Sequence, residues 1–140
     1  MDVPARAEAK SKMLRILLVE DSESMRAFVS ACLDQGATQL GEVELIQAAS
    51  GFDALRLLPR GRYDLVISDI NMPDINGLEL LNFIRANEKY RDLPVLLIST
   101  QSSEKDRQRG LALGATVFLA KPFSSEQLVA ALRAALDGAS

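Results

Sequence analysis

Five charged or hydroxyl side chains at the ends of apolar runs in this 140-residue sequence could carry out chemistry together. Glu20 and Asp21 follow the first run, Asp69 follows the third, Ser99 closes the fourth, and Lys121 follows the fifth. Asp69 is a candidate nucleophile, because a carboxylate with an ordinary pKa near about 3.9 is ionised at neutral pH and needs no general base. Phosphoryl transfer to a carboxylate needs mainly positioning and charge neutralisation, which this set of residues can supply.

Three carboxylates gathered at one place require a cation. Two unit charges about 4 Å apart repel by about 4 kcal/mol at an effective dielectric constant of about 20. Without a bound cation, some of Glu20, Asp21 and Asp69 would have to be protonated. Oxygen ligands without histidine or cysteine select Mg²⁺, or Mn²⁺, over zinc and copper. The Lys121 ammonium would ion-pair with a phosphoryl group, and the Ser99 hydroxyl could donate a hydrogen bond to it.

Each of these residues also has a simpler structural explanation when it is taken alone. An acidic residue after a strand often caps the next helix, and for Asp21 by itself this is the preferred interpretation. Ser99 is then a small polar residue at a strand end, and Lys121 is an exposed lysine. The coincidence of all the polar residues at one edge of a parallel sheet favours a functional site.

The residue types that are missing exclude other chemistries. The chain has no histidine and a single cysteine, Cys32, so Ser-His-Asp and Cys-His nucleophile systems, histidine-ligated zinc and intrachain disulfides are excluded. Cys32 lies among Phe28, Val29 and Leu33 on an apolar helix pattern, and we expect it to be buried rather than reactive. The net charge of −3 argues against a nucleic-acid-binding surface.

The sequence predicts no membrane insertion and no secretion. It has no run of 18 apolar residues, which a membrane span requires. Residues 1–12 lack the apolar region of a signal peptide, and we expect them to form a mobile tail before a domain at 13–138. Residence in the cytoplasm is therefore the expected localisation.

The candidate residues are positioned by an alternation of short apolar runs and helical patterns. Nearly continuous apolar runs are typical of strands buried on both faces of a parallel sheet. Five strand–helix units joined by right-handed crossovers predict a doubly wound α/β fold with its ligand site at the carboxyl ends of the strands. The expected strands are Leu14–Val19, Val43–Ala49, Asp64–Ser68, Val95–Ser99 and Thr116–Ala120. The expected helices are Ser24–Leu33, Phe52–Leu58, Leu78–Ile84, Glu104–Leu113 and a last helix that Ser124 caps.

The expected helix at Glu104–Leu113 differs from the others. Its first six residues, EKDRQR, are polar, so it can bury little before its last turn. By contact density it should be the least firmly held helix of the domain. The alternative is an ordinary helix with one solvated face.

Four motifs in order make the chain resemble bacterial response-regulator receiver domains of the single-domain chemotaxis (CheY-like) type. The resemblance covers residues 13–138 and implies a flavodoxin-like (βα)5 fold, a five-stranded parallel sheet with strand order 2-1-3-4-5. The motifs are LLVEDS (17–22), DLVISDINMPDINGLELL (64–81), LPVLLIST (93–100) and GATVFLAKPF (114–123).

The resemblance also implies a role for each candidate residue. Asp69 would accept a phosphoryl group from the phosphohistidine of a partner histidine kinase or phosphotransfer domain, with Lys121 and Ser99 assisting. The metal ligands would be Asp21, Asp69, the backbone carbonyl of Asn71, and Glu20 directly or through water. Such a domain is a phosphoacceptor switch rather than a turnover enzyme, although it supports its own phosphorylation and slow dephosphorylation.

The resemblance further implies a switch that a downstream protein reads. Ser99 and Phe118 would shift on phosphorylation and remodel the face around Phe118 and the last two helices. From the residues alone, Phe118 is better explained as a core residue of an apolar strand. The Lys121-Pro122 peptide bond is expected to be cis.

The sequence departs from the best-known family member at three points. Glu20 replaces an aspartate of the acidic pair, which could lengthen one metal contact. Thr100 follows Ser99 where alanine or glycine is usual, and its bulk could slow access to the phosphoryl group. The stretch 34–42 is longer than usual, which indicates either a partner-specific loop or tolerated extra length.

Two other functions are alternatives to a regulatory switch. The first keeps the receiver fold but makes it a phosphate sink or a relay carrier, and the sequence does not separate this from a regulatory output. The second is a small phosphatase with an aspartate nucleophile. Such enzymes carry a second aspartate two residues after the first, and here Asn71 stands at that position.

Overall fold

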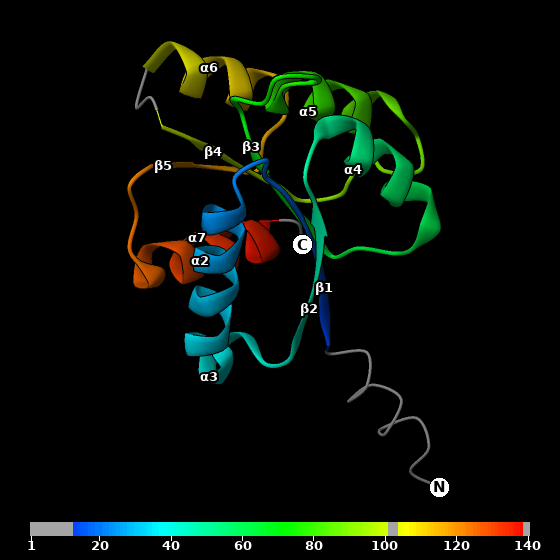
Figure 1. The fold of residues 1–140 in the computed structure, drawn as a ribbon. Coiled ribbons are helices and arrows are strands. Elements are labelled where there is room, and N and C mark those ends of the chain that lie inside the picture. The colour runs from blue at the N-terminus through cyan, green and yellow to red at the C-terminus, as the bar shows by residue number, and fades with distance from the viewer. Residues whose placement is uncertain (1–12, 101–103, 139–140) are drawn as a thin grey trace, which may run out of the picture.

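Five parallel strands form one sheet in the order β2-β1-β3-β4-β5 (Figure 1). The structure is a computed structural model, in which residues 13–100 and 104–138 are described. Every strand pair is parallel, so the carboxyl ends of all five strands lie at one edge of the sheet. The predicted fold class and strand order are therefore confirmed. The strands are β1 (Leu14–Val19), β2 (Val43–Ala48), β3 (Leu65–Asp69), β4 (Val95–Ser99) and β5 (Val117–Ala120).

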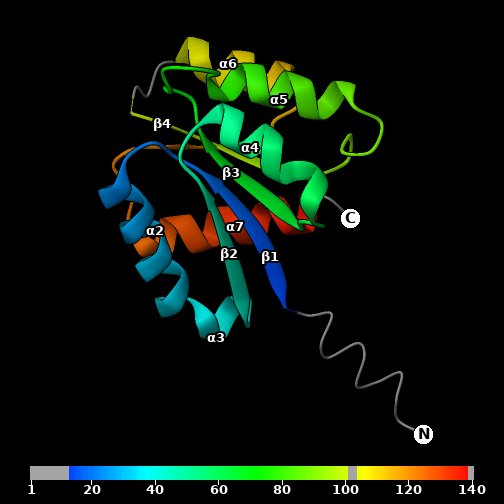
Figure 2. The same ribbon diagram turned by 45° about the vertical axis from the view of Figure 1, so that its right-hand side comes forward.

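Helices cover both faces of this sheet. One face carries α2, α3 and α7, and the other carries α4, α5 and α6 (Figures 1 and 2). The helices are α2 (Glu23–Gln35), α3 (Ala37–Leu40), α4 (Gly51–Leu57), α5 (Gly77–Ala86), α6 (Glu104–Ala112) and α7 (Ser125–Gly138), and the short 3-10 helix η1 (Leu58–Arg60) follows α4. None of the helices in the described ranges is long and apolar enough to cross a membrane.

Alternate residues of the central strands point into two separate cores. On β1, Ile16 and Leu18 pack in a cluster with α2 and α7, whereas Leu17 and Val19 pack in a cluster with α4 and α5. This follows from the two-residue period of a strand. The strands that carry the candidate site are thus held from both sides, and Cys32 is buried in the first core as predicted.

The element boundaries differ from the predicted ones by a few residues. Strand β3 includes Asp69, β2 ends at Ala48, and β5 begins at Val117. Helix α7 has the predicted cap, because the Ser124 hydroxyl accepts a hydrogen bond from the Gln127 backbone N–H at 3.1 Å. Pairing with neighbouring strands and the geometry of the caps set these ends, and a hydropathy pattern locates them only approximately.

The long stretch 34–42 contains a helix that the sequence analysis did not predict. Helix α3 occupies Ala37–Leu40, and its last residue, Leu40, is buried in the core with α2 and α7. A Cβ at Gly36 would lie 2.6 Å from Cγ2 of Val129, so the turn into α3 is packed closely against α7. The extra length therefore forms an ordered part of the domain.

Helix α6 has little buried surface, as its polar sequence predicts. Gly110 is its only buried residue, while Leu111 and the following Leu113 are exposed. Its predicted low stability stays a prediction. The tail predicted for residues 1–12 lies outside the described residues.

Candidate functional site

The predicted polar residues meet at the carboxyl edge of the sheet. Oxygen atoms of the Glu20, Asp21 and Asp69 carboxylates lie within 4.8 Å of one another. Glu20 is 2% exposed, Asp69 4% and Ser99 0%, whereas Asp21 is exposed. The structure therefore brings together two buried carboxylates and one exposed carboxylate from the ends of β1 and β3.

Backbone hydrogen bonds between neighbouring strands hold these residues in place. The Glu20 N–H donates to the carbonyl of Ala48 at 3.0 Å, which continues the ladder between β1 and β2. The Lys121 N–H donates to the carbonyl of Ser99 at 2.8 Å. The lysine and the serine, far from the acidic residues in sequence, are thereby fixed beside each other at the end of β4 and β5.

The Lys121 ammonium reaches both buried carboxylates. Its Nζ lies 3.2 Å from Oε1 of Glu20 and 3.4 Å from Oδ2 of Asp69. A buried charge needs an oppositely charged partner, because an unpaired buried charge is strongly destabilising. One ammonium against two buried carboxylates, with Asp21 beside them, leaves an excess of negative charge in the site.

The second oxygen of Asp69 indicates where a further ligand fits. Oδ1 of Asp69 is buried and has no hydrogen-bond partner among the described residues, although buried polar atoms are nearly always paired. Oε2 of Glu20, by contrast, accepts a hydrogen bond from the Ser22 N–H at 3.1 Å. An orphan carboxylate oxygen in an acidic pocket matches the oxygen ligands that Mg²⁺ prefers, so the residues present fit a divalent cation.

Burial perturbs both buried acids. The pKa of Asp69 is raised by burial, and the ammonium of Lys121 opposes this shift. Burial also raises the pKa of Glu20; the Ser22 backbone N–H and Lys121 lower it, while the charge of Asp69 raises it further. Both carboxyl groups therefore hold their protons more tightly than ordinary acids, and a cation would restore their ionised form.

Asp21 is not the cap of the helix that follows it. The N-cap of α2 is Ser22, whose hydroxyl accepts a hydrogen bond from the Met25 N–H at 3.2 Å. The simpler structural explanation for Asp21 is therefore wrong, and its carboxylate lies within reach of Glu20 and Asp69.

The segment after Asp69 is fixed by contacts that the sequence analysis did not identify. The Gly77 N–H donates to the carbonyl of Ile70 at 2.9 Å, and a Cβ at Gly77 would collide with the Asp69 carbonyl. Asn76 and Glu79 form a capping box at the start of α5. The spacing of Asn76 and Glu79 is a recognisable signal, whereas the close approach at Gly77 depends on the three-dimensional fold.

A second contact ties this segment to α4. The Asp74 carboxylate accepts hydrogen bonds from the N–H groups of Gly51 at 3.3 Å and Phe52 at 2.9 Å. These bonds lower the pKa of Asp74, the Phe52 N–H most of all. The loop beside Asp69 is thus bonded to the N-terminus of a helix more than 20 residues earlier.

Asn71 and Thr100 are linked above the site. The Asn71 Nδ2 donates a long hydrogen bond of 3.4 Å to Oγ1 of Thr100, and both side chains are exposed. This contact places Thr100, the residue that departs from the usual pattern, next to the loop after the candidate nucleophile. The predicted metal contact of the Asn71 backbone carbonyl stays a prediction.

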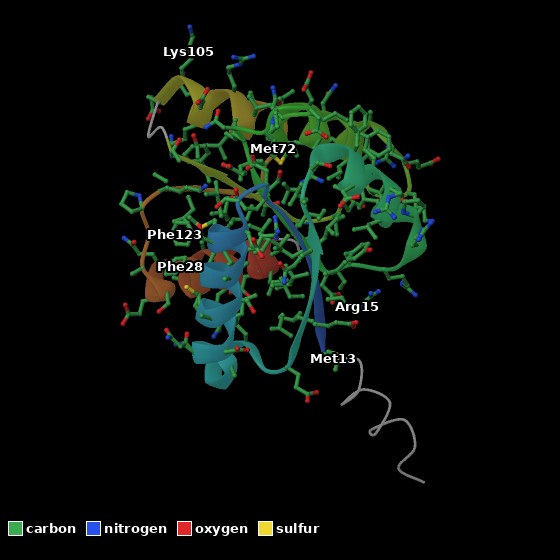
Figure 3. All side chains as sticks on the ribbon, viewed as in Figure 1. Met13, Arg15, Phe28, Met72, Lys105 and Phe123 are labelled. Carbon is green, nitrogen blue, oxygen red and sulfur yellow. The ribbon has the colours of Figure 1, made fainter. Side chains whose placement is uncertain are left out.

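The segment that follows Lys121 is anchored by aromatic packing. The Lys121-Pro122 peptide bond is cis, as the resemblance implied. Phe123, the next residue, is buried and lies beside Phe28 of α2 with ring centroids 5.6 Å apart (Figure 3). Phe118 is partly buried and packs against the core with α4 and α5, which agrees with the core interpretation and leaves its switch role a prediction.

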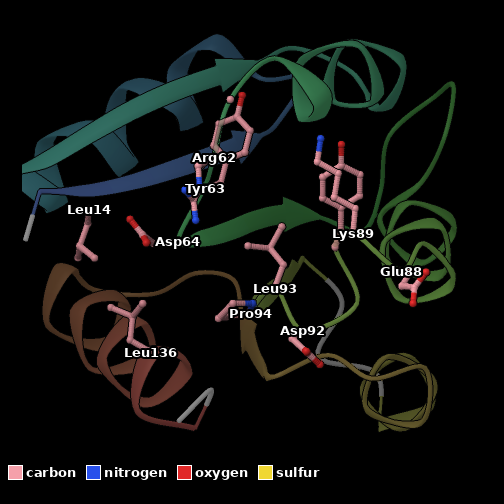
Figure 4. Close-up of a pocket in the computed structure, with 12 residues that line it drawn as sticks. Leu14, Arg62, Tyr63, Asp64, Glu88, Lys89, Asp92, Leu93, Pro94 and Leu136 are labelled. Atoms are coloured by element: carbon pink, nitrogen blue, oxygen red, sulfur yellow. The ribbon is translucent and has the colours of Figure 1, made fainter. Parts of the chain in front are cut away.

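A hollow of about 800 Å³ lies at the opposite edge of the sheet (Figure 4). Its lining includes Leu14 at the start of β1, Asp64 just before β3 and Pro94 just before β4. None of the predicted site residues lines it. The candidate chemistry is therefore located by the convergent charges at the carboxyl edge rather than by this hollow.

Comparison with known proteins agrees with this geometry. The family profile described as a response regulator receiver domain matches residues 16–133. A chemotaxis protein CheY homolog of Campylobacter jejuni is 33% identical over 116 residues, which are 82% of this chain and 86% of that protein. Chemotaxis protein CheY-3 of Vibrio cholerae is 34% identical over 118 residues, covering 84% of this chain and 88% of that protein. The structure of Vibrio cholerae CheY4 superimposes with a TM-score of 0.77 and 38% identity, covering 86% of this chain and 97% of that one.

Proposed function

The chain belongs to the family of response regulator receiver domains of two-component signalling, and we propose that it is a switch phosphorylated on Asp69. The observation that carries this proposal is the placement of Asp69. Its carboxylate is buried at the carboxyl edge of the sheet, one oxygen lies 3.4 Å from the Lys121 ammonium, and the other has no hydrogen-bond partner within residues 13–100 and 104–138. A nucleophile for phosphoryl transfer needs this combination of an available oxygen and a nearby positive charge.

The proposed metal is Mg²⁺, with Mn²⁺ as a possible substitute. The residues that would hold it are Asp21, Asp69, the Asn71 backbone carbonyl, and Glu20 directly or through water. When bound, the cation would supply charge neutralisation for the transferred phosphoryl group. The support is the cluster of three carboxylates and the orphan oxygen of Asp69.

The proposed reaction uses the chain's own side chains as follows. An oxygen of Asp69 forms a bond to phosphorus while the bond from phosphorus to the donor's histidine nitrogen breaks, and that electron pair leaves with the imidazole. The donor histidine belongs to a partner histidine kinase or phosphotransfer domain, since this chain has no histidine. Lys121 would then pair with the new phosphoryl charge, and the Ser99 hydroxyl would donate a hydrogen bond to it.

The output is proposed to be a change in the face formed by α6, β5 and α7. An inward shift of Ser99 would pull on the end of β4, and Phe118 on the neighbouring strand would move with it. The hydrogen bond from the Lys121 N–H to the Ser99 carbonyl supports this coupling. A phosphorylation-dependent partner protein would read the new face, because a conformational shift requires differential binding to the two states. Receiver boundaries of 13–138 and residence in the cytoplasm belong to the same proposal.

The test of the phosphoacceptor is labelling of purified protein with radioactive acetyl phosphate in the presence of Mg²⁺. We expect the wild type to incorporate up to one phosphate and Asp69→Asn to incorporate none. Asp92→Asn, which changes an exposed aspartate near the opposite edge, is the matched control and should be labelled like the wild type. Equal labelling of Asp69→Asn would overturn the assignment.

A pull-down with beryllofluoride, a phosphoryl mimic, separates the switch from the phosphate sink or relay carrier. A switch should capture a partner only when the mimic is bound, and failure to find one would favour the sink. Continued hydrolysis of small phosphomonoesters beyond one equivalent would instead support the phosphatase, which the asparagine at position 71 disfavours.

A further inference from the structure

Strand β2 presents an unpaired backbone edge. It is the first strand in the sheet order and pairs only with β1 in the described part of the chain. The carbonyls of Glu42 and Ala48 accept hydrogen bonds from the β1 side, at 2.9 and 3.0 Å. Since alternate residues of a strand direct their backbone groups to opposite edges, the N–H and C=O groups of Val43, Leu45 and Gln47 face outward.

The same three residues line a groove of about 460 Å³ beside this edge. The groove lies between β2 and the helices α2 and α3, which flank the strand in Figure 2. Its other lining residues are Met13, Ser30, Leu33, Asp34, Ala37, Gly41 and Glu42. Helix α3 comes from the extra stretch 34–42, so the segment with no role in the phosphorylation site builds one wall of this groove.

The charged side chains of the described residues that line the groove are all acidic. The described residues that line it include the carboxylates of Asp34 and Glu42 and no lysine or arginine. Neither carboxylate forms an ion pair with another described residue. Glu44, on the other face of β2, is paired with Arg15 at 3.1 Å. The groove therefore combines apolar side chains with negative charge that has no positive partner in the described part of the chain.

Edge strands of this kind are usually protected from pairing. Proteins block them with charged side chains, especially lysine, with proline, with a bulge, or with a covering segment. The one charged residue of β2, Glu44, is paired with Arg15. The β2 sequence, VELIQA, contains neither lysine nor proline, and β2 pairs with β1 in regular register along its whole length. No other described strand pairs with this edge, which therefore has the regular geometry that a further strand requires.

We propose that this groove binds an extended, basic segment of a partner protein, which adds to the sheet as a strand beside β2. Main-chain hydrogen bonds would form with Val43, Leu45 and Gln47, as in other cases of strand addition. Apolar side chains of the segment would pack on Leu33 and Leu45, and its lysine or arginine side chains would pair with Asp34 and Glu42. A second copy of this chain is a poorer occupant, because its groove carries the same negative charge.

This binding would be independent of the phosphorylation switch. The groove shares no residue with the acidic site, which lies at the ends of β1 and β3. The segment would therefore tether a partner in both phosphorylation states, and the Asp69→Asn variant should bind it as the wild type does.

The test is nuclear magnetic resonance of the whole chain with a synthetic eight-residue peptide that alternates valine or leucine with lysine. We expect the amide hydrogens of Val43, Leu45 and Gln47 to gain protection from exchange, with no change at Glu44 and Ile46. A matched peptide with glutamate in place of lysine should bind at least tenfold more weakly. Absence of protection at the three amides would overturn the proposal.

Reversing the charge of the two groove carboxylates provides an independent test of the proposal. The double variant Asp34→Lys/Glu42→Lys should lose at least tenfold in affinity for the lysine peptide and prefer the glutamate peptide. Glu126→Lys/Asp137→Lys makes the same charge change at exposed positions of α7 and should bind like the wild type. Equal binding by both double variants would contradict the proposal. Protection of the same amides without peptide, together with a doubled mass in sedimentation, would show a second copy as the occupant and would also overturn it.

Discussion

The ammonium nitrogen of Lys121, which follows β5, lies 3.4 Å from Oδ2 of Asp69 at the end of β3. The two side chains are 11% and 5% exposed, so water screens this pair only weakly. In the unphosphorylated protein, Lys121 therefore already neutralises part of the negative charge of Asp69. The proposed phosphorylation would add to that negative charge.

Replacement of Lys121 by methionine should destabilise the protein and make its stability depend on divalent cations. The variant leaves Glu20 and Asp69 buried without the Lys121 ammonium that both of them contact. Loss of one partner of a buried pair typically costs about 3–5 kcal/mol. Protonation of one carboxyl group would reduce this loss. Urea unfolding at neutral pH should show the decrease, and added Mg²⁺ should restore more stability to the variant than to the wild type. An unchanged unfolding midpoint in both conditions would show that the pair contributes nothing.

Cation binding should weaken as the pH falls and the carboxyl groups of Asp69 and Glu20 become protonated. Metal ligands must be ionised, and burial raises both pKa values. Mg²⁺ binding should therefore release protons, which calorimetry in two buffers of different ionisation enthalpy would detect. Asp69→Asn should release fewer protons. Mg²⁺ binding that releases no proton as the pH is lowered would contradict the expectation.

The raised pKa values of Asp69 and Glu20 also determine the direction in which stability changes with pH when no cation is bound. An acid whose pKa is higher in the folded state binds more protons when folded, between its unfolded and its folded pKa. The contribution of such an acid to the free energy of unfolding is therefore fully present below its pKa in the unfolded state. This contribution is lost as the pH rises through its pKa in the folded state. Unfolding followed against pH should show a contribution of this sign for the wild type, and a smaller one for Asp69→Asn.

Most of the architecture was accessible from the sequence, because its signals are local and periodic. Continuous apolar runs predicted the strands of a parallel sheet, and such a sheet necessarily brings Glu20, Asp69, Ser99 and Lys121 to one edge. The predicted meeting of Glu20, Asp69 and Lys121 is confirmed by their distances, and the Ser99 carbonyl accepts a hydrogen bond from the Lys121 N–H. Their roles in phosphorylation and metal binding stay predictions.

What the sequence did not predict depends on partners distant along the chain. Helix α3 has four residues, too few for a periodic pattern, and it is held by the burial of Leu40 against α2 and α7. The orphan oxygen of Asp69 reflects which neighbours the fold leaves beside it. The bond from Asp74 to α4 spans 22 residues, so neither local segment indicates the other.

Gly77 should tolerate no side chain, although its backbone is not in the left-handed region. A Cβ there would collide with the carbonyl of Asp69 and lie 2.8 Å from the Cα of Ile70. Both are backbone atoms, so the end of β3 would have to move. Overpacking of this kind costs about 1–3 kcal/mol, and Gly77→Ala should lower both the unfolding midpoint and the rate of labelling of Asp69 by acetyl phosphate.

Gly138→Ala is the matched control for that variant. Among the described residues, a Cβ at Gly138 would meet only Cγ2 of Thr116, at an ordinary contact distance of 3.7 Å, so we expect little change in stability or labelling. If Gly77→Ala behaved like this control, the close packing of Gly77 against Asp69 would affect neither the stability of the protein nor the labelling of Asp69.

Asp74→Asn should remove a pH-dependent part of the stability and loosen the contact between the phosphoacceptor loop and α4. The backbone N–H groups of Phe52 and Gly51 bind the ionised carboxylate and contribute to its lowered pKa. An acid with a lowered folded pKa contributes stability above its unfolded pKa and loses it as the pH falls through the folded value. The wild type should therefore lose more stability than Asp74→Asn on acidification through this range. Hydrogen exchange should also show faster opening at Gly51 and Phe52 in the variant, whereas Asp137→Asn, at an exposed position of α7, should match the wild type in both measurements.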